Sequence, residues 1–150
     1  MRNTIIVDVD GTLSNTSKRV NFAQAGEWDM FHSLLHEDEP WEDVKIIINN
    51  LSSMDFLIIG LTGRNEKWRA MTGEWLFKHK IQMDDLIMRP DGDFTPDKII
   101  KPKMLNEYCL INLGKPAIEE VLVILEDRDR VVEEWRNLGF NCWQVRAGGY

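Results

Sequence analysis

Short apolar runs alternate with amphipathic stretches along the whole chain. The apolar runs are rich in Val, Ile and Leu and only a few residues long, which is typical of strands buried inside a sheet. They cover residues 4–9, 56–61, 86–88, 121–125 and 142–145. The pattern therefore predicts five strands.

Between these runs the apolar positions recur with helical spacing. Val44, Ile47, Ile48 and Leu51 follow an i, i+3, i+4, i+7 pattern. Further helices are expected over 68–76, from Thr95-Pro96 as cap and first position, and over 131–138. Pro102 would end or restart the third of these helices. Strands that alternate with helices predict an α/β fold with a doubly wound, mostly parallel five-stranded sheet.

The segment 14–39 departs from this alternation. It is polar, contains the aromatic residues Phe22, Trp28 and Phe31, and is too long for an ordinary connection. An insertion of this kind often covers a site at one edge of a sheet, although a loosely helical decoration fits the pattern as well. We therefore expect one domain over residues 1–150, with 14–39 as a small cap-like insertion after the first strand.

Composition narrows the range of partners. The chain has 18 Lys and Arg against 25 Asp and Glu, a formal net charge of -7, which argues against binding along a nucleic-acid duplex. A small phosphorylated substrate or a gripped strand end stays possible. The two cysteines, Cys109 and Cys142, are too few for a disulfide framework. Without a membrane span or export signal, the sequence predicts a cytoplasmic protein with reduced thiols.

Two acids follow the first expected strand. Asp8 and Asp10 would project to the same side of an extended segment, where their charges repel unless a cation or a shared proton relieves them. A hard divalent ion with oxygen ligands, such as Mg²⁺, would do so. Gly11 would let the chain turn sharply after the second acid. A solvated pair of acids at a turn is the alternative.

Other strand ends carry further candidate groups. Thr62, Gly63 and Arg64 follow the second strand, and a hydroxyl, a glycine amide and a helix N-terminus together form an anion site. Glu126 and Asp127 follow the fourth strand, where acids would also stabilise the next helix N-terminus. An ordinary strand-to-helix turn explains the first group equally well. Lys101, taken alone, would be a surface residue.

Taken together, the order DxDGT, then Thr, then Lys, then an acidic pair resembles the haloacid dehalogenase (HAD) superfamily of phosphotransferases. The likeness covers nearly the whole chain. Within the superfamily it is most similar to the 3′-phosphatase domain of bacteriophage polynucleotide kinase–phosphatase. Besides the first motif, Asp8 to Leu13, it rests on Arg19, Thr62-Gly63-Arg64, Gly92-Asp93, Ile99-Ile100-Lys101, Glu126-Asp127-Arg128, Val131-Val132-Glu133, Trp135-Arg136 and Cys142-Trp143-Gln144-Val145.

The resemblance implies a HAD-like Rossmannoid fold and a role for each matching residue. Asp8 would be the nucleophile that forms an aspartyl-phosphate, and Asp10 the general acid and base. Thr62, the Gly63 amide and Lys101 would bind the phosphoryl oxygens, and Arg19, Arg64 and Asp93 would lie around the substrate. Mg²⁺ would be held by Asp8, Asp10 and Asp127. Glu126 stands where the relatives have an aspartate, so it would reach the metal through water.

The organic half of the substrate stays open at this stage. A 3′-phosphorylated strand end is expected first, and a (deoxy)nucleoside 5′-monophosphate is the alternative. No GxxxxGK[ST] motif occurs, so we expect a phosphatase module without a kinase. A phospho-acceptor receiver domain and a silent binding module are rival interpretations. Oligomeric state, base preference and DNA versus RNA are not predicted.

Two groups of residues have two interpretations each. One group is basic and either follows a nucleic-acid backbone or forms a solvated face: Arg64, Lys67, Arg69, Lys78, His79, Lys80 and Arg89. The other is aromatic and either stacks a base or packs the insertion against the domain: Trp28, Phe31 and Trp41.

Overall fold

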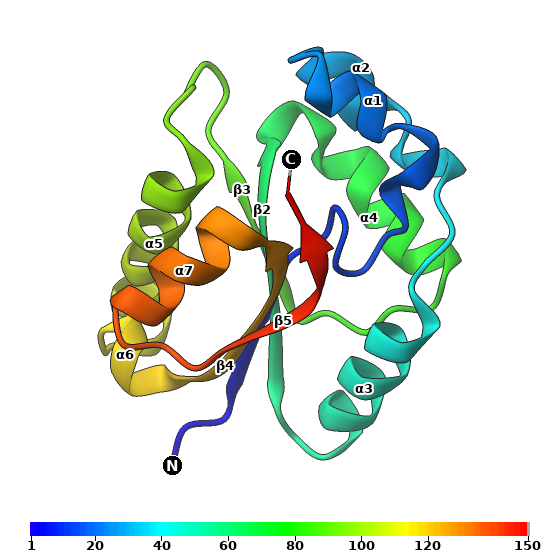
Figure 1. Cartoon of the computed structure of the whole chain (residues 1–150). Coiled ribbons are helices and arrows are strands. Elements are labelled where there is room, and N and C mark those ends of the chain that lie inside the picture. Colours follow the sequence, from blue (N-terminus) through cyan, green and yellow to red (C-terminus); the bar gives the residue numbers. More distant parts are fainter. Residues whose placement is uncertain (150) are drawn as a thin grey trace.

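All five expected strands are present and lie in one parallel sheet (Figure 1). The computed structural model describes residues 1–149. The strands are β1 (Thr4–Val7), β2 (Leu57–Asn65), β3 (Asp85–Arg89), β4 (Val121–Arg128) and β5 (Cys142–Gly148). Their order across the sheet is β3-β2-β1-β4-β5, and every pairing is parallel. The α/β class and the doubly wound sheet are therefore confirmed.

Helices cover both faces of the sheet, as Figure 1 shows. One face carries α3 (Glu42–Ser53), the turn η3 (Glu66–Trp68) and α4 (Arg69–Lys78). The other carries α5 (Asp97–Tyr108), its continuation η4 (Cys109–Leu113), α6 (Ala117–Glu120) and α7 (Asp129–Asn137). The helical stripe on α3 is narrower than predicted, because Val44 and Ile48 are buried whereas Ile47 is exposed.

The central strand, β1, has an uninterrupted apolar run because both of its faces are buried. Ile5 and Val7 of β1 pack into the core under α3 and α4, and Ile6 packs into the core under α5 and α7. A strand that is buried on both faces must be apolar throughout, not in alternation. Each such aliphatic side chain contributes about 1.5–3 kcal/mol on burial. β1, the strand that precedes Asp8 and Asp10, is thus firmly packed between the two layers of helices.

The strand order places a natural ligand site at the carboxyl ends of β1 and β4. From β1 the chain first builds one half of the sheet, β2 and β3, and then returns to build β4 and β5 on the other side. Ligands bind where this order reverses, beyond the carboxyl ends of the strands. A receiver-type sheet has the order 2-1-3-4-5. The observed topology therefore argues against the receiver interpretation.

Three strands do not end where their apolar runs end. β1 stops at Val7, so Asp8 and Asp10 lie beyond the strand and strand alternation does not orient them. β2 and β4 run further than their apolar residues do, to Asn65 and Arg128. Their polar ends stay in the sheet because the edge strands β3 and β5 pair with them there, after a shift of register.

Two helix starts also differ. Thr62-Gly63-Arg64 lie within β2, and Asn65 and the 3₁₀ turn η3 separate them from α4, so the N-terminus of α4 does not complete the predicted anion site. α5 begins at Asp97, one residue later than predicted, with Pro96 outside it as cap. It continues through Pro102 at the cost of one backbone hydrogen bond.

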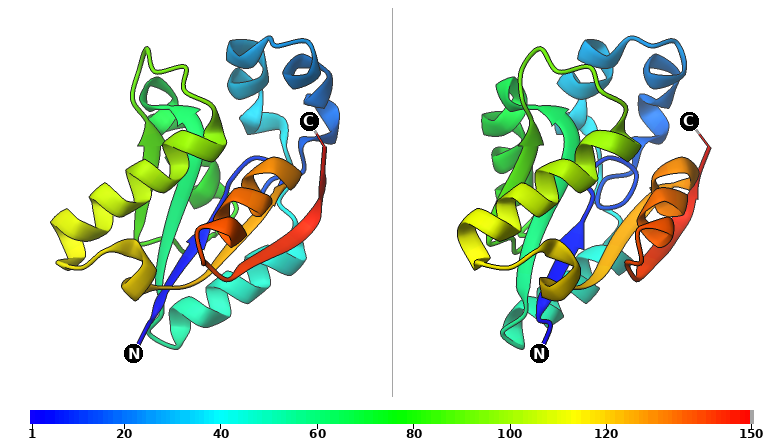
Figure 2. Two further views of the ribbon diagram at one scale, coloured as in Figure 1. Left: turned by 60° about the vertical axis from the view of Figure 1, so that its left-hand side comes forward. Right: turned by 90° about the vertical axis from the view of Figure 1, so that its left-hand side faces the viewer.

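The insertion forms short helical turns above the carboxyl edge of the sheet (Figure 2). They are η1 (Thr16–Lys18), α1 (Val20–Gln24), α2 (Trp28–Ser33) and η2 (Leu35–Glu37). The two ends of the segment meet, because Ser14 forms a β-bridge with Pro40 and the Asn15 amide donates to the Glu39 carbonyl at 2.9 Å. Among residues 1–149, no helix combines the length and the apolar character needed to cross a membrane.

Candidate active site

A buried lysine joins two carboxylates at the point where the strand order reverses. Lys101 Nζ lies 2.9 Å from Asp8 Oδ1 and 2.7 Å from Glu126 Oε2, and all three side chains are buried. Asp8 comes directly after β1, Glu126 lies in β4 and Lys101 in α5. Taken alone, Lys101 was predicted to be a surface residue. This prediction is wrong, because its side chain lies at the centre of the buried cluster.

The two acids of β4 have different surroundings. The Glu126 carboxylate accepts hydrogen bonds from Lys101 and from the amides of Asp127 and Arg128, at 3.1 and 3.3 Å for the two amides. Asp127 Oδ1 lies 3.2 Å from the hydroxyl of Thr12, which is also 3.3 Å from Asp8 Oδ2. Three donors thus bind the Glu126 carboxylate, whereas the Thr12 hydroxyl lies between Asp127 Oδ1 and the Asp8 oxygen that does not face Lys101.

Three of these carboxylates lie close enough to hold one metal ion. Asp8, Glu126 and Asp127 each offer an oxygen, and these oxygens all lie within 4.8 Å of one another. Burial and the neighbouring Glu126 raise the pKa of Asp8 well above its usual value, although Lys101 lowers it. Burial and Glu126 also raise the pKa of Asp127, to about 7. Since one ammonium faces three buried carboxylates, this cluster lacks positive charge.

A second network holds Asp10. Its Oδ1 accepts from Arg19 Nη2 at 2.6 Å and from Arg64 Nη2 at 2.5 Å. Burial would raise the pKa of Asp10, but Arg64 and Arg19 outweigh it and hold the pKa well below its usual value. Arg19 is itself fixed by Asp38 and by the Phe31 carbonyl, and Arg64 by the His32 carbonyl. Residues of the insertion therefore set the position of both arginines.

This network also fixes Arg19 and Arg64, which were expected around the substrate. Both side chains are buried and bind Asp10 together with groups of the insertion. Arg64 lines the active-site cavity and keeps one buried nitrogen, Nε, without a hydrogen-bond partner among the described residues. Both arginines are therefore held against Asp10, and Arg64 also borders the space in which a substrate is expected.

Thr62 and Gly63 line the cavity together with Asp97, a residue that the sequence analysis did not identify. The carboxylate of Asp97 binds Arg89 and, at 2.7 Å, Arg128. A Cβ added to Gly63 would lie 2.8 Å from Asp97 Cγ, so only glycine fits there. Asp97 precedes Lys101 by four residues, one helical turn, and this spacing was the available signal.

Asp93, which was expected near the substrate, lines the cavity and also binds its own loop. Hydrogen bonding from the Thr95 side chain and from the Thr95 amide, which lies 2.9 Å from Asp93 Oδ1, lowers the pKa of the Asp93 carboxyl. Asp93 lines the outer part of the cavity, whereas Asp97 lines the inner part beside Lys101. His32 is a second residue that the sequence did not reveal. It is buried in the cavity wall, and burial lowers its pKa to about 4.

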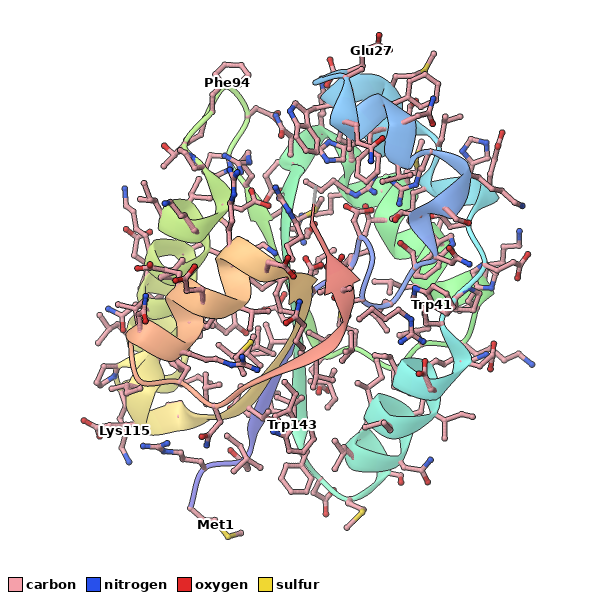
Figure 3. The ribbon with its side chains drawn as sticks, in the orientation of Figure 1. Met1, Glu27, Trp41, Phe94, Lys115 and Trp143 are labelled. Atoms are coloured by element: carbon pink, nitrogen blue, oxygen red, sulfur yellow. The ribbon has the colours of Figure 1, made fainter. Side chains whose placement is uncertain are left out.

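Many of these groups line one cavity of about 410 Å³, whereas Arg19, Glu126 and Asp127 are not among its lining residues. Its floor contains Asp8, Asp10, Thr62 and Lys101. Its walls come from the insertion on one side and from the β3–α5 loop and the first turns of α5 and α7 on the other. Figure 3 shows Glu27, next to α2, and Phe94, in the β3–α5 loop, at the tops of these two walls.

The aromatic and basic groups of the sequence separate into different environments. Phe31 is buried under the Arg19 guanidinium, 4.1 Å from its ring, and the Trp41 ring lies under Arg146. Of the three expected aromatic residues, Trp28 and Phe31 line the cavity and Trp41 does not. Of the basic residues, four form ion pairs: Arg64, Lys67, Arg69 and Arg89. Arg64 and Arg89 are buried, so neither of the two alternatives, a nucleic-acid backbone track or a solvated face, describes the basic group as a whole.

Comparisons with known proteins agree with this site. The family model described as "Polynucleotide kinase PNKP phosphatase domain" matches residues 2–150. The "Putative bifunctional polynucleotide kinase/RNA ligase" of Autographa californica nuclear polyhedrosis virus is 28% identical over 136 residues, 89% of this chain and 18% of that protein. A chain of the Pnkp1/Rnl/Hen1 RNA repair complex has 31% identity and a TM-score of 0.79, over 98% of this chain and 43% of that one.

More distant structures share the fold alone. A haloacid dehalogenase-like hydrolase from Streptococcus pneumoniae has 12% identity and a TM-score of 0.68, over 99% of this chain and 94% of that one. L-2-haloacid dehalogenase from Xanthobacter autotrophicus has 13% identity and the same TM-score, 0.68, over 97% of this chain and 78% of that one. The chain thus spans most of these hydrolases but less than half of the polynucleotide kinase relatives. With its match over residues 2–150, the chain belongs to the family of polynucleotide kinase PNKP phosphatase domains and is a HAD-like phosphatase.

Proposed function

We propose that this phosphatase is a Mg²⁺-dependent phosphomonoesterase that acts through an aspartyl-phosphate on Asp8 and removes the 3′-phosphate from a polynucleotide end. The observation that carries the proposal is the buried cluster in which Lys101 faces Asp8 and Glu126 beside Asp127, with Asp8 and Lys101 lining the cavity. Groups that are costly to bury are gathered where a ligand site is expected.

The donor set fits a divalent cation. Three buried carboxylates with a single ammonium carry an excess of negative charge, and the raised pKa values of Asp8 and Asp127 reflect it. Oxygen ligands of this kind suit Mg²⁺. Asp8, the Asp10 carbonyl and Asp127 would hold the ion, and Glu126, already bonded to Lys101, would reach it through water. A bound ion would supply positive charge beside the phosphoryl group and keep the carboxylates ionised.

Asp8 would act as the nucleophile. One carboxylate oxygen would form a bond to phosphorus while the ester P–O bond breaks, and the bonding electrons would leave with the alkoxide oxygen. Water would then attack the aspartyl-phosphate, releasing inorganic phosphate and restoring the carboxylate. Lys101 holds Asp8 Oδ1 at 2.9 Å, which orients the attacking group.

Asp10 would carry the proton between these two steps. It would protonate the leaving alkoxide and later accept a proton from the attacking water. Arg19 and Arg64 hold its pKa low in the absence of substrate, which suits the base step. A bound phosphate ester adds negative charge nearby, and this raises the pKa of a neighbouring carboxyl. The acid step would therefore depend on the bound substrate.

The phosphoryl oxygens would be bound by Lys101, Thr62 and the Gly63 amide. An ammonium group has three donors. Lys101 uses two of them on Asp8 and Glu126, so the third would serve the substrate. Because the Asp97 carboxylate lies so close to Gly63, no side chain projects from the cavity wall at this position. Asp93 would contribute through the loop that it stabilises.

We also propose that residues 1–150 act as one catalytic module with 14–39 as its cap. The ends of the insertion meet at Ser14 and Pro40, so it can be attached without disturbing the sheet. A reducing, cytoplasmic setting would suit Cys109 and Cys142, which are free and buried. Burial raises the pKa of these thiols, to about 11 and 12, and this keeps them unreactive.

A substrate panel tests the proposed function. Phosphate release would be measured from 3′-phosphorylated oligonucleotides, 3′-mononucleotides, 5′-mononucleotides and a sugar phosphate, each with Mg²⁺ and with EDTA. The 3′-phosphorylated oligonucleotide should have the highest kcat/KM, and EDTA should abolish all turnover. A preference for 5′-mononucleotides would select the nucleotidase alternative, and no turnover of any ester would refute the proposal.

A further inference from the structure

Four exposed side chains, two aromatic and two cationic, line the active-site cavity. Phe94, at the top of the β3–α5 loop, is 90% exposed, and Trp28, at the start of α2, is 42% exposed. Lys98 in α5 and Arg130 in α7 line the same cavity and are exposed. Within residues 1–149, neither of these two cations forms an ion pair, unlike the arginines below them.

The loop that carries Phe94 is braced on both sides of it. Arg89 Nη1 donates to the carbonyls of Asp93, at 3.1 Å, and Thr95, at 2.5 Å, and Arg89 Nε donates to the Gly63 carbonyl at 2.7 Å. One buried guanidinium thus ties the residues before and after Phe94 to the cavity wall. A loop held in this way presents the ring to solvent in a defined place.

Trp28 is held in a comparable way on the opposite wall. Its ring packs edge-to-face on Phe31, with 5.8 Å between ring centroids, and the guanidinium of Arg128 lies 5.9 Å from the ring. The neighbouring Asp29 pairs with Lys67 at 2.8 Å, which links α2 to the turn after β2. Figure 3 shows the two walls on either side of the opening, with Phe94 labelled at the top of one.

We propose that this rim is a binding site for the last nucleotides of a single-stranded nucleic-acid end, and it rests on the proposed function of the cavity below it. Trp28 and Phe94 stack the bases, while Lys98 and Arg130 bind the phosphodiester that follows the terminal sugar. Aromatic faces beside cations are the chemistry that single strands require. The rim therefore makes the enzyme prefer an oligonucleotide over a mononucleotide.

The chain offers a matched control for the aromatic part. Phe77, in α4, is 88% exposed, nearly the same as Phe94, but it lines no part of the active-site cavity. Phe94→Ala and Phe77→Ala thus remove the same ring from equally exposed positions, and neither should change the thermal unfolding temperature.

Steady-state kinetics would be measured with 3′-phosphorylated DNA and RNA of one to eight nucleotides and with p-nitrophenyl phosphate. KM should fall as the strand grows from one to about three nucleotides and then level. Phe94→Ala and Trp28→Ala should each raise KM for the oligonucleotides about 10-fold, the effect of losing one stacked base. The kcat, and all constants for p-nitrophenyl phosphate, should stay unchanged, and Phe94→Tyr should restore KM.

The cationic part has its own readout. Lys98→Ala and Arg130→Ala should each reduce the slope of log KM against log salt by about one charge contact. Equal KM for mononucleotide and oligonucleotide, or equal effects of Phe94→Ala and Phe77→Ala, would overturn the inference. Either result, with Mg²⁺-dependent hydrolysis of p-nitrophenyl phosphate intact, would leave the proposed phosphatase function standing.

Discussion

The floor and the rim of the cavity are built on opposite principles. On the floor, Asp8 and Lys101 are buried and bonded to each other, and Lys101 also binds the buried Glu126. On the rim, Phe94 and Lys98 are exposed, although the backbone beneath Phe94 is firmly held. Buried, mutually bonded groups have a fixed geometry, which suits a chemical step that is the same for every ester. Exposed groups on a fixed backbone suit recognition of a variable partner.

This contrast predicts that changes on the floor affect every substrate, whereas changes on the rim affect only oligonucleotides. The largest floor effect is expected for Asp8→Asn. Removing the nucleophile should lower kcat by roughly 10⁴-fold or more for oligonucleotides and p-nitrophenyl phosphate alike. Asp55→Asn, at an exposed turn position, is the matched control and should be fully active. Substantial turnover by Asp8→Asn would show that the nucleophile is another group.

Lys101→Met tests whether the buried network also supports the fold. The substitution leaves Asp8 and Glu126 without their cation, and breaking a buried ion pair on one side costs about 3 kcal/mol of unfolding free energy. Urea denaturation in EDTA would measure it. Lys103→Met, at an exposed position of the same helix, should change the unfolding free energy by less than about 0.5 kcal/mol. Similar stability of the two variants would contradict the network described here.

The different surroundings of the two β4 acids predict different metal responses. Asp127→Asn should raise the Mg²⁺ concentration for half-maximal activity by about 100-fold, and Glu126→Gln, an indirect contact, by about 10-fold. Glu133→Gln, exposed on α7, serves as control. The reverse order of the two effects would make Glu126 the direct ligand.

A smaller effect is expected on the pH dependence of stability without metal. Burial and Glu126 raise the pKa of Asp127 to about 7, above its unfolded value near 3.8. Between these values the native state binds more protons than the unfolded state, so stability should fall as pH rises. Melting temperatures of wild type and Asp127→Asn in EDTA would show it: the variant should gain on the wild type from pH 4 to pH 7. A constant difference would argue against the raised pKa.

Sequence patterns were sufficient to predict the strands that are buried through their own apolar side chains. The apolar runs of β1 and β4 identified the strands, and acids directly after such runs identified Asp8 and Asp127. Strand ends were harder to predict, because the polar Asn65 and Arg128 are held in the sheet by neighbouring strands and not by their own side chains.

Residues that act through long-range contacts were the ones that patterns missed or misjudged. Asp97 lies in an unremarkable polar segment, and only its bonds to Arg89 and Arg128 reveal its place in the cavity wall. Arg64 was recognised as a site residue, but its bond to Asp10, which spans 54 positions of the chain, was not predicted. Phe94 is a single aromatic residue in a turn, and its braced, exposed position can be seen only in three dimensions.

Covalent phosphorylation of Asp8, the residue that follows β1, is the step on which the proposed mechanism depends. The enzyme would be mixed with excess 3′-phosphorylated oligonucleotide and Mg²⁺, quenched in acid within one turnover, digested and analysed by mass spectrometry. A phosphoryl group on the peptide that contains Asp8, absent from Asp8→Asn, is the predicted result. Full turnover with no phosphorylated peptide, or with the phosphoryl group on a residue outside the cavity floor, would contradict the account.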